Sequence, residues 1–158
     1  MKTNFKGIGI LIAALLLLSA CSHSGHDDHD HGHAHVHHAP HGGSLVMLGD
    51  HLYQLELVAD TEEGELSLFI LDGEAENFIR IEAATIMAST QTQGSQQALV
   101  FSAQPNEATG ETVGNTSHFT AKAPWLAEHS EFEAVFELID IRGRGFENIP
   151  FPFPEGSH

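Results

Sequence analysis

The sequence predicts an all-β protein with a single β-sandwich of about seven to eight short strands. Polar and apolar residues alternate in several segments, most clearly over residues 132–139, and this is the period of a strand with one buried face. Turn-forming pairs such as Asp72-Gly73 separate these segments. No segment has a long 3.6-residue period, so helices should contribute little.

The first expected strand follows a glycine pair. The expected strands lie at residues 45–48, 53–57, 66–70, 78–83, 98–102, 118–121, 132–139 and 146–153. The last segment contains Pro150 and Pro152. Proline cannot donate to a central ladder, so this strand should lie at a sheet edge.

The remaining segments are expected to be turns and loops. Residues 60–64 form a turn cluster, residues 89–97 and 104–115 are polar connections with glycine, and Pro124 can begin one helical turn. In the strand at 132–139, the alternation places Leu138 on the same face as the other apolar residues. Trp125, Phe132 and Phe136 are expected in the core.

The N-terminal end has the layout of a secretory signal. Lys2 and Lys6 precede an apolar run at residues 8–18, which is shorter than the roughly 20 residues of a membrane span. The segment Leu18-Ser19-Ala20-Cys21 resembles the lipobox of bacterial lipoproteins. This resemblance implies cleavage before Cys21 and acylation of that residue, whereas an ordinary secreted protein would leave the cysteine unmodified. Ser22 after the cysteine favours the periplasmic face of the outer membrane over the inner membrane.

Four zones follow from this reading: a signal peptide at residues 1–20, a disordered leader at 21–41, a β-sandwich domain at 42–153 and a tail at 154–158. Without Lys2 and Lys6, four cations remain against 22 carboxylates. So acidic a chain argues against a nucleic-acid partner. Its membrane contact is expected through the lipid anchor.

The leader is the main functional feature of the sequence, because nine of the thirteen histidines lie in residues 23–41. Imidazole suits zinc, copper, nickel and cobalt better than magnesium or calcium. Zinc is the expected ion, with the other three as alternatives. The candidate ligands of the leader are His23, His26, His29, His31, His33, His35, His37, His38 and His41. The alternative is that the leader is a solvated spacer of biased composition without a role in metal binding.

The leader ends in Pro40-His41-Gly42-Gly43, and an "x-Leu-Glu-Leu-Val" segment follows at residues 54–58. This pattern resembles a periplasmic β-domain that occurs in and beside adaptor proteins of heavy-metal efflux systems of the resistance-nodulation-division class. The resemblance implies a β-sandwich and a role near copper, zinc, cobalt or nickel, with His41 at the motif position. The chain lacks the other domains of such an adaptor.

Two readings of His41 stay open. It is either the last member of the tract, with Gly42-Gly43 as a hinge, or a ligand held at the rim of the domain. His51, in the first hairpin turn, is its candidate partner, although a lone turn histidine is more often solvated. His118, His129 and His158 stand alone in the sequence.

No catalytic motif is present, so we do not expect an enzyme. The sequence instead predicts a lipid-anchored, periplasmic protein that buffers transition-metal ions or hands them to an efflux or uptake protein. The alternative is a protein-docking β-sandwich lipoprotein in which the histidine tract is only a spacer.

Overall fold

The structure is a computed structural model that describes residues 37–92 and 94–154. The expected signal peptide, Cys21, the leader histidines from His23 to His35 and His158 lie outside the described residues. The strands are β1 (Ser44–Leu48), β2 (Tyr53–Asp60), β3 (Glu65–Asp72), β4 (Thr85–Thr92), β5 (Ser95–Ala103), β6 (His118–Lys122), β7 (Phe132–Ile141) and β8 (Arg144–Phe153). Two short 3-10 helices, η1 (Glu107–Thr109) and η2 (Pro124–Ala127), complete the elements.

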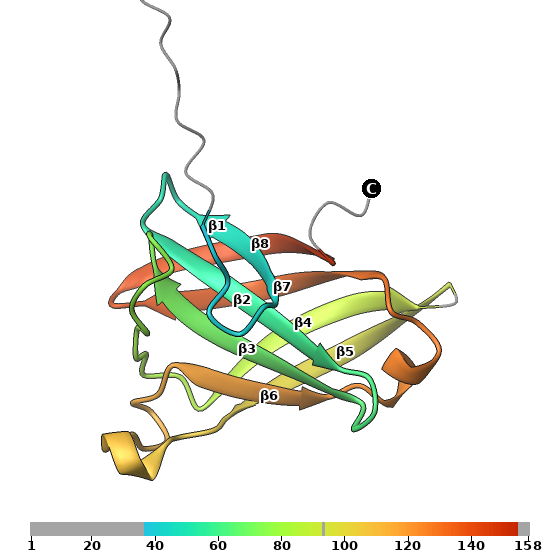
Figure 1. Ribbon diagram of the computed structural model, residues 1–158. Coiled ribbons are helices and arrows are strands. Elements are labelled where there is room, and N and C mark those ends of the chain that lie inside the picture. Colours follow the sequence, from blue (N-terminus) through green and yellow to red (C-terminus); the bar gives the residue numbers. More distant parts are fainter. Residues whose placement is uncertain (1–36, 93, 155–158) are drawn as a thin grey trace, which may run out of the picture. The chain divides into compact units, whose positions relative to one another are not determined.

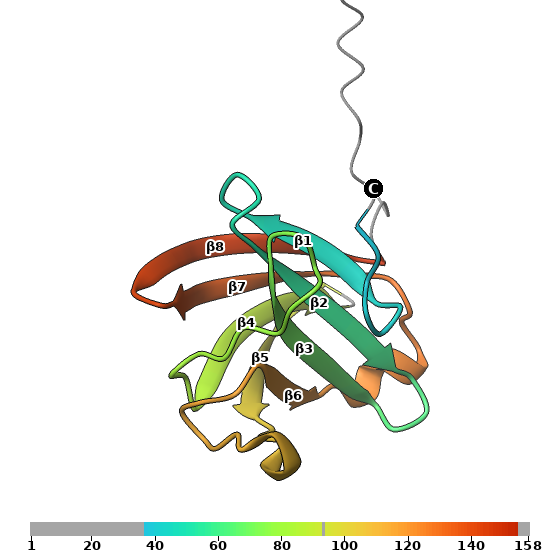
Figure 2. The ribbon, with the colours of Figure 1, turned by 60° about the vertical axis from the view of Figure 1, so that its left-hand side comes forward.

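The all-β prediction is confirmed, and the strands form one continuous antiparallel sheet. Its order is β1-β2-β3-β6-β5-β4-β7-β8. The sheet curls so far that β1 and β8, at its two ends, also contact each other, as Figures 1 and 2 show. The two layers of the expected sandwich are therefore opposite walls of a single, nearly closed sheet.

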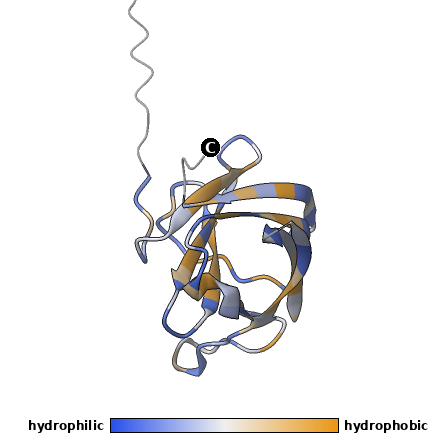
Figure 3. Ribbon diagram, turned by 90° about the vertical axis from the view of Figure 1, so that its right-hand side faces the viewer, coloured by the Kyte–Doolittle hydropathy of each residue, from blue (hydrophilic) through white to orange (hydrophobic). Residues whose placement is uncertain are grey.

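The core lies inside the curled sheet. Its largest fully buried side chains include the rings of Phe101, Phe119, Phe136 and Phe151 from four different strands. Hydrophobic and hydrophilic residues alternate along the strands (Figure 3), as expected for strands with one buried face. Trp125 packs at the margin of this core, while Phe132 and Phe136 are buried in it, as predicted.

One strand was predicted in the wrong place. Residues 78–83 make only isolated bridges, of which Phe78 pairs with Leu71 and Ile81 pairs with Thr116. The regular strand is β4, which overlaps the loop expected at residues 89–97. Its buried positions include Thr90 and Thr92, so polar side chains occupy inner positions and the strand has no apolar alternation to recognise.

The predicted face of Leu138 was also wrong. Leu138 is 51% exposed, whereas Ile139 is 1% exposed. In β7 the buried residues are therefore the even-numbered ones up to Phe136 and the odd-numbered ones from Ile139 onwards. On the paired strand β8, Asn148 has a φ of +51°, and the regular partners resume on either side of it, at Phe136–Ile149 and Leu138–Glu147. This local irregularity reverses the side-chain alternation, which is otherwise strictly two residues.

Other expectations agree with the structure. Strand β8, with its two prolines, lies at one end of the sheet order. Pro124 begins η2, as expected for a proline at the first helical position. In the described part of the chain, no helix is long and apolar enough to cross a membrane.

Candidate functional site

The site lies on the outer face of the sheet, where three side chains form a row across neighbouring strands. Glu56 of β2 is the partner of Phe69 on β3, and Phe69 is the partner of His118 on β6. Residues directly opposite one another in antiparallel strands place their side chains on the same face. The register alone therefore brings a carboxylate, a phenyl ring and an imidazole together.

The segment before β1 packs against Glu56 and Phe69 of this row. It passes β2 and turns back into β1 (Figure 1), and a hydrogen bond from the Gly42 N–H to the Ala39 carbonyl closes the turn. The segment belongs to residues expected in the disordered leader, but here its end packs on the domain. It is held by hydrogen bonds to Glu56 and by the stacking of His41 on Phe69, and the composition of the segment gave no sign of either.

Glu56 holds the segment through three contacts. Its Oε1 accepts hydrogen bonds from the backbone N–H of His41, at 2.7 Å, and of Gly43, at 3.1 Å. Its Oε2 lies 2.9 Å from Nδ1 of His41. The Glu56 side chain has no exposed surface, whereas that of His41 is 39% exposed. A buried carboxylate needs such partners, because an unpaired one would be strongly destabilised by loss of hydration.

The two glycines of the His-Gly-Gly motif are required for different structural reasons. Gly42 has a φ of +72°, the left-handed region that glycine adopts without strain. Gly43 lies so close to β2 that an added Cβ would be 2.5 Å from the Leu57 carbonyl oxygen and 2.8 Å from Cγ2 of Val58. The motif is thus a close-packed turn that delivers two N–H groups and an imidazole to Glu56.

The contact with Glu56 fixes the chemistry of His41. A carboxylate oxygen accepts a hydrogen bond from Nδ1–H, so the neutral ring carries its proton there and presents a lone pair at Nε2. Metal-binding histidines commonly have this arrangement, with a carboxylate orienting the ring from behind. Nε2 of His41 has no hydrogen-bond partner within residues 37–92 and 94–154.

Phe69 separates His41 from a second imidazole. The Phe69 ring stacks on His41 at a centroid distance of 3.8 Å and on His118 at 4.3 Å. The two imidazoles must lie on opposite faces of the phenyl ring, since both stack on it nearly parallel. With metal–nitrogen bonds of about 2.0 to 2.1 Å, one ion cannot bridge them.

His118 is half-buried and in a different environment from His41. Its Nε2 lies 3.2 Å from the Ser67 hydroxyl. Burial lowers the pKa of His118 below its ordinary value of 6.5, and the nearby His41 lowers it further, while Glu111 and Glu65 act in the opposite direction. The ring is therefore predominantly neutral near pH 7.

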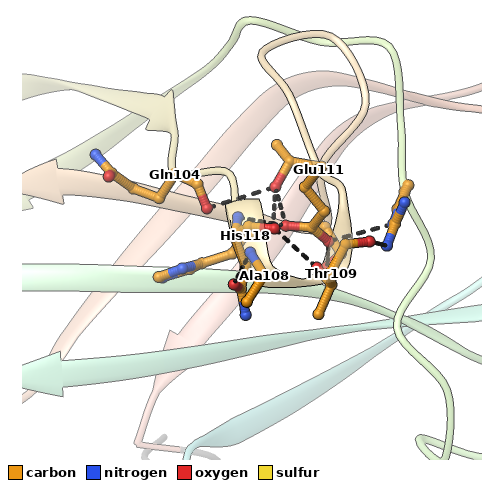
Figure 4. Close-up of polar contacts among 9 residues, drawn as sticks. Gln104, Ala108, Thr109, Glu111 and His118 are labelled. Carbon is orange, nitrogen blue, oxygen red and sulfur yellow. Dashed lines mark hydrogen bonds and ion pairs between the residues drawn. The ribbon is translucent and has the colours of Figure 1, made fainter.

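An open pocket of about 470 Å³ borders this stack. Glu111 lines this pocket and accepts hydrogen bonds from the hydroxyls of Thr116, at 2.9 Å, and Ser117, at 3.1 Å. Figure 4 shows the polar contacts around Glu111 beside His118. Nε of Arg80 lies 3.4 Å from the same carboxylate. Burial raises the pKa of Glu111, but these hydrogen bonds, one from the Asn106 N–H and the charge of Arg80 outweigh it, so the pKa lies below its ordinary value.

The remaining predicted ligands in the described residues have other neighbours. The His51 ring lies 5.8 Å from the ring of His37, whereas the contacts of His41 are with Glu56, Phe69 and Phe78. His38 is exposed. In the described segments no three His, Cys, Asp or Glu residues are grouped so that they could hold a metal ion together.

Sequence reasoning missed the roles of Glu56 and His118. Glu56 occupies an outward position in an alternating strand, which ordinarily means a solvated side chain. Its place in the motif beside the His-Gly-Gly turn was the available signal. His118 is far from the tract in sequence, and only the β3–β6 pairing brings it here.

Comparison of the chain with protein-family models, with curated proteins and with solved structures finds no match.

Proposed function

We propose that this chain binds transition-metal ions in the bacterial cell envelope, buffering them or handing them to an efflux or uptake protein. In this proposal Cys21 carries the lipid anchor and the leader histidines collect the ions. The folded domain supplies fixed imidazoles beside the end of the leader. Zinc is the expected ion, with copper, nickel and cobalt as alternatives.

The observation that carries the proposal is the 2.9 Å contact between His41 Nδ1 and Glu56 Oε2. It holds the tautomer and orientation that a metal ligand needs before any ion arrives. A preformed ligand loses less conformational freedom on binding than one on a free chain. His41 should therefore bind an ion more tightly than an average histidine of the tract.

The geometry also limits what His41 can do. His118 cannot share its ion, because Phe69 lies between the two rings. An ion on His41 would take its remaining ligands from the leader or from water. Such an incomplete site suits transfer, since ligands can be exchanged one at a time.

Titration of the mature protein, made soluble by Cys21→Ser, tests the proposal. We expect more than one equivalent of Zn²⁺ at pH 7.5 and much weaker binding at pH 5.5, because protonated imidazole has no lone pair for a metal. Replacing the six leader histidines from His23 to His35 by asparagine should remove most equivalents. In that background, His41→Gln should weaken binding further, whereas His129→Gln, which removes one imidazole elsewhere, should not.

Two outcomes would contradict the proposal. One is no stoichiometric uptake of Zn²⁺, Cu²⁺, Ni²⁺ or Co²⁺ by the mature protein. The other is equal affinity at the two pH values. Either would favour the alternative of a docking module whose histidine tract is a spacer.

A further inference from the structure

His37 is partly buried although it lies in a polar segment. Its side chain is 11% exposed, and its Nε2 is a buried atom with no hydrogen-bond partner in the part of the chain that the structure describes. Leaving a buried polar atom unpaired is costly, so native proteins seldom do it without a ligand or water at that position.

The other nitrogen of His37 shows which atom is available. Nδ1 lies 3.4 Å from the backbone carbonyl oxygen of Glu74 and 4.0 Å from Oε2 of the same residue. Both are acceptors, so the neutral ring carries its proton on Nδ1 and its lone pair on Nε2. A histidine that donates from one nitrogen to a carbonyl and offers the other is the usual form of a metal ligand.

His51 supplies a second imidazole. Its ring centroid lies 5.8 Å from that of His37, with the planes inclined at 52°. Two imidazoles on one ion place their nitrogens about 2.0 to 2.1 Å from it, and the ring centroids then lie at a comparable separation. His51 is exposed, so its ring can turn towards a shared ion.

The backbone position of His51 is fixed more firmly than that of an ordinary turn residue. It has a φ of +62°, and Gly73 packs against it so closely that an added Cβ would lie 1.8 Å from the His51 carbonyl oxygen. The Gly73 carbonyl in turn accepts a 2.7 Å hydrogen bond from Nε2 of Gln54, which is buried. These contacts join the β1–β2 turn to the end of β3, where Glu74 follows.

We propose that His37 and His51 form a two-imidazole site for a transition-metal ion, with Glu74 orienting the His37 ring at Nδ1. This inference rests on the proposed function and adds a position to it, distinct from His41. The partner of His51 is then His37, not His41. The site would hold an ion at the folded end of the leader, after the histidines from His23 to His35.

The experiment uses the mature chain with Cys21→Ser, with the six leader histidines from His23 to His35 and also His38 replaced by asparagine. The probe is Cu²⁺ alone, because pulsed electron paramagnetic resonance counts the imidazoles bound to it. We expect the first equivalent to show two imidazoles. His37→Gln or His51→Gln should reduce this count to one and weaken binding at least about tenfold. His129→Gln should change neither reading.

The possible outcomes separate this inference from the proposed function. A one-imidazole signal that neither His37→Gln nor His51→Gln alters would overturn the inference, leaving a bridging water as the partner of His37. The same holds if the histidine-depleted chain binds no Cu²⁺ while the chain with its leader intact binds several. Absence of binding in the intact chain would instead reject the proposed function.

Discussion

His41 and Glu56 form a hydrogen-bonded pair in which an imidazole nitrogen meets a fully buried carboxylate at 2.9 Å. The same carboxylate accepts two backbone N–H groups from the turn that follows Pro40. One side chain of β2 thus both anchors the segment before β1 and sets the tautomer of its histidine. A structural role and a ligand-orienting role meet in Glu56, and variants can separate them.

Glu56→Gln should both destabilise the fold and remove the hydrogen-bond acceptor that fixes the tautomer of His41. The glutamine carbonyl oxygen can still accept from both backbone N–H groups that Oε1 of Glu56 binds, but its amide presents a donor to Nδ1 of His41. We expect the free energy of unfolding to fall by about 2 kcal/mol, the scale of lost hydrogen bonds to a buried charge. Denaturant unfolding measures this. The exposed Glu137→Gln is the control, and an equal loss in both variants would mean that the Glu56 contacts contribute little.

Gly43→Ala tests the close approach of the turn to β2. Its Cβ would lie 2.5 Å from the Leu57 carbonyl oxygen, so the turn must move. We expect a loss of about 1 to 3 kcal/mol, as for other overpacked sites, and weaker metal binding at His41. Gly42→Asn should be much milder, since asparagine tolerates positive φ and nothing lies within 4 Å of that position. The reverse order of the two effects would contradict this account of the motif.

The strands could be predicted from the sequence wherever the apolar residues are the buried ones and the polar residues are exposed. Segments 66–70 and 132–136 alternate in sequence and in burial, whereas segment 53–57 alternates in sequence alone, because residues 54–57 are all buried. β4 was hidden because threonines fill inner positions, and the phase change in β7 was hidden because it depends on the backbone at Asn148 of the paired strand. Both misses concern tertiary pairing, which a local pattern does not contain.

The candidate site was only partly readable. The motif drew attention to His41, and Gly42-Gly43 was recognised as a turn. The partners of His41 and His51 come from strand register and loop packing, which place Glu56 beside one and His37 beside the other. Alternating strands mark Glu56 as a surface residue, and only the covering segment makes it buried.

The half-buried His118 should make stability fall as pH drops below the ordinary histidine pKa of about 6.5. Burial and the neighbouring His41 lower its pKa in the folded state, so the unfolded chain binds the proton more readily. Stability should therefore fall as pH drops through the ordinary histidine value of about 6.5. His118→Gln should flatten this part of the profile in chelator-treated protein, whereas the exposed His38→Gln should not. An unchanged slope for His118→Gln would show that other groups control it.

The β-domain should fold without a metal ion and be stabilised further when it binds zinc. The core is built from apolar side chains such as Leu55, Phe101 and Phe136, so chelator should leave a cooperative thermal transition. Saturating Zn²⁺ should then raise the melting temperature only through sites that exist in the folded state, because ligands of a flexible tract bind equally well when the domain is unfolded. At a free Zn²⁺ concentration 100 times the dissociation constant of one folded site, the free energy of unfolding rises by about 2.7 kcal/mol, which raises the melting temperature by about 10 °C.

Scanning calorimetry with and without Zn²⁺ separates the two kinds of site. Replacing the leader histidines from His23 to His35 should remove bound ions but keep the zinc-dependent shift. Combining His37→Gln with His41→Gln should abolish the shift while the leader still binds zinc. Loss of the transition on chelation would reveal a structural metal site. A zinc shift that survives the double variant would place the folded-state site elsewhere, since neither imidazole would then contribute to it.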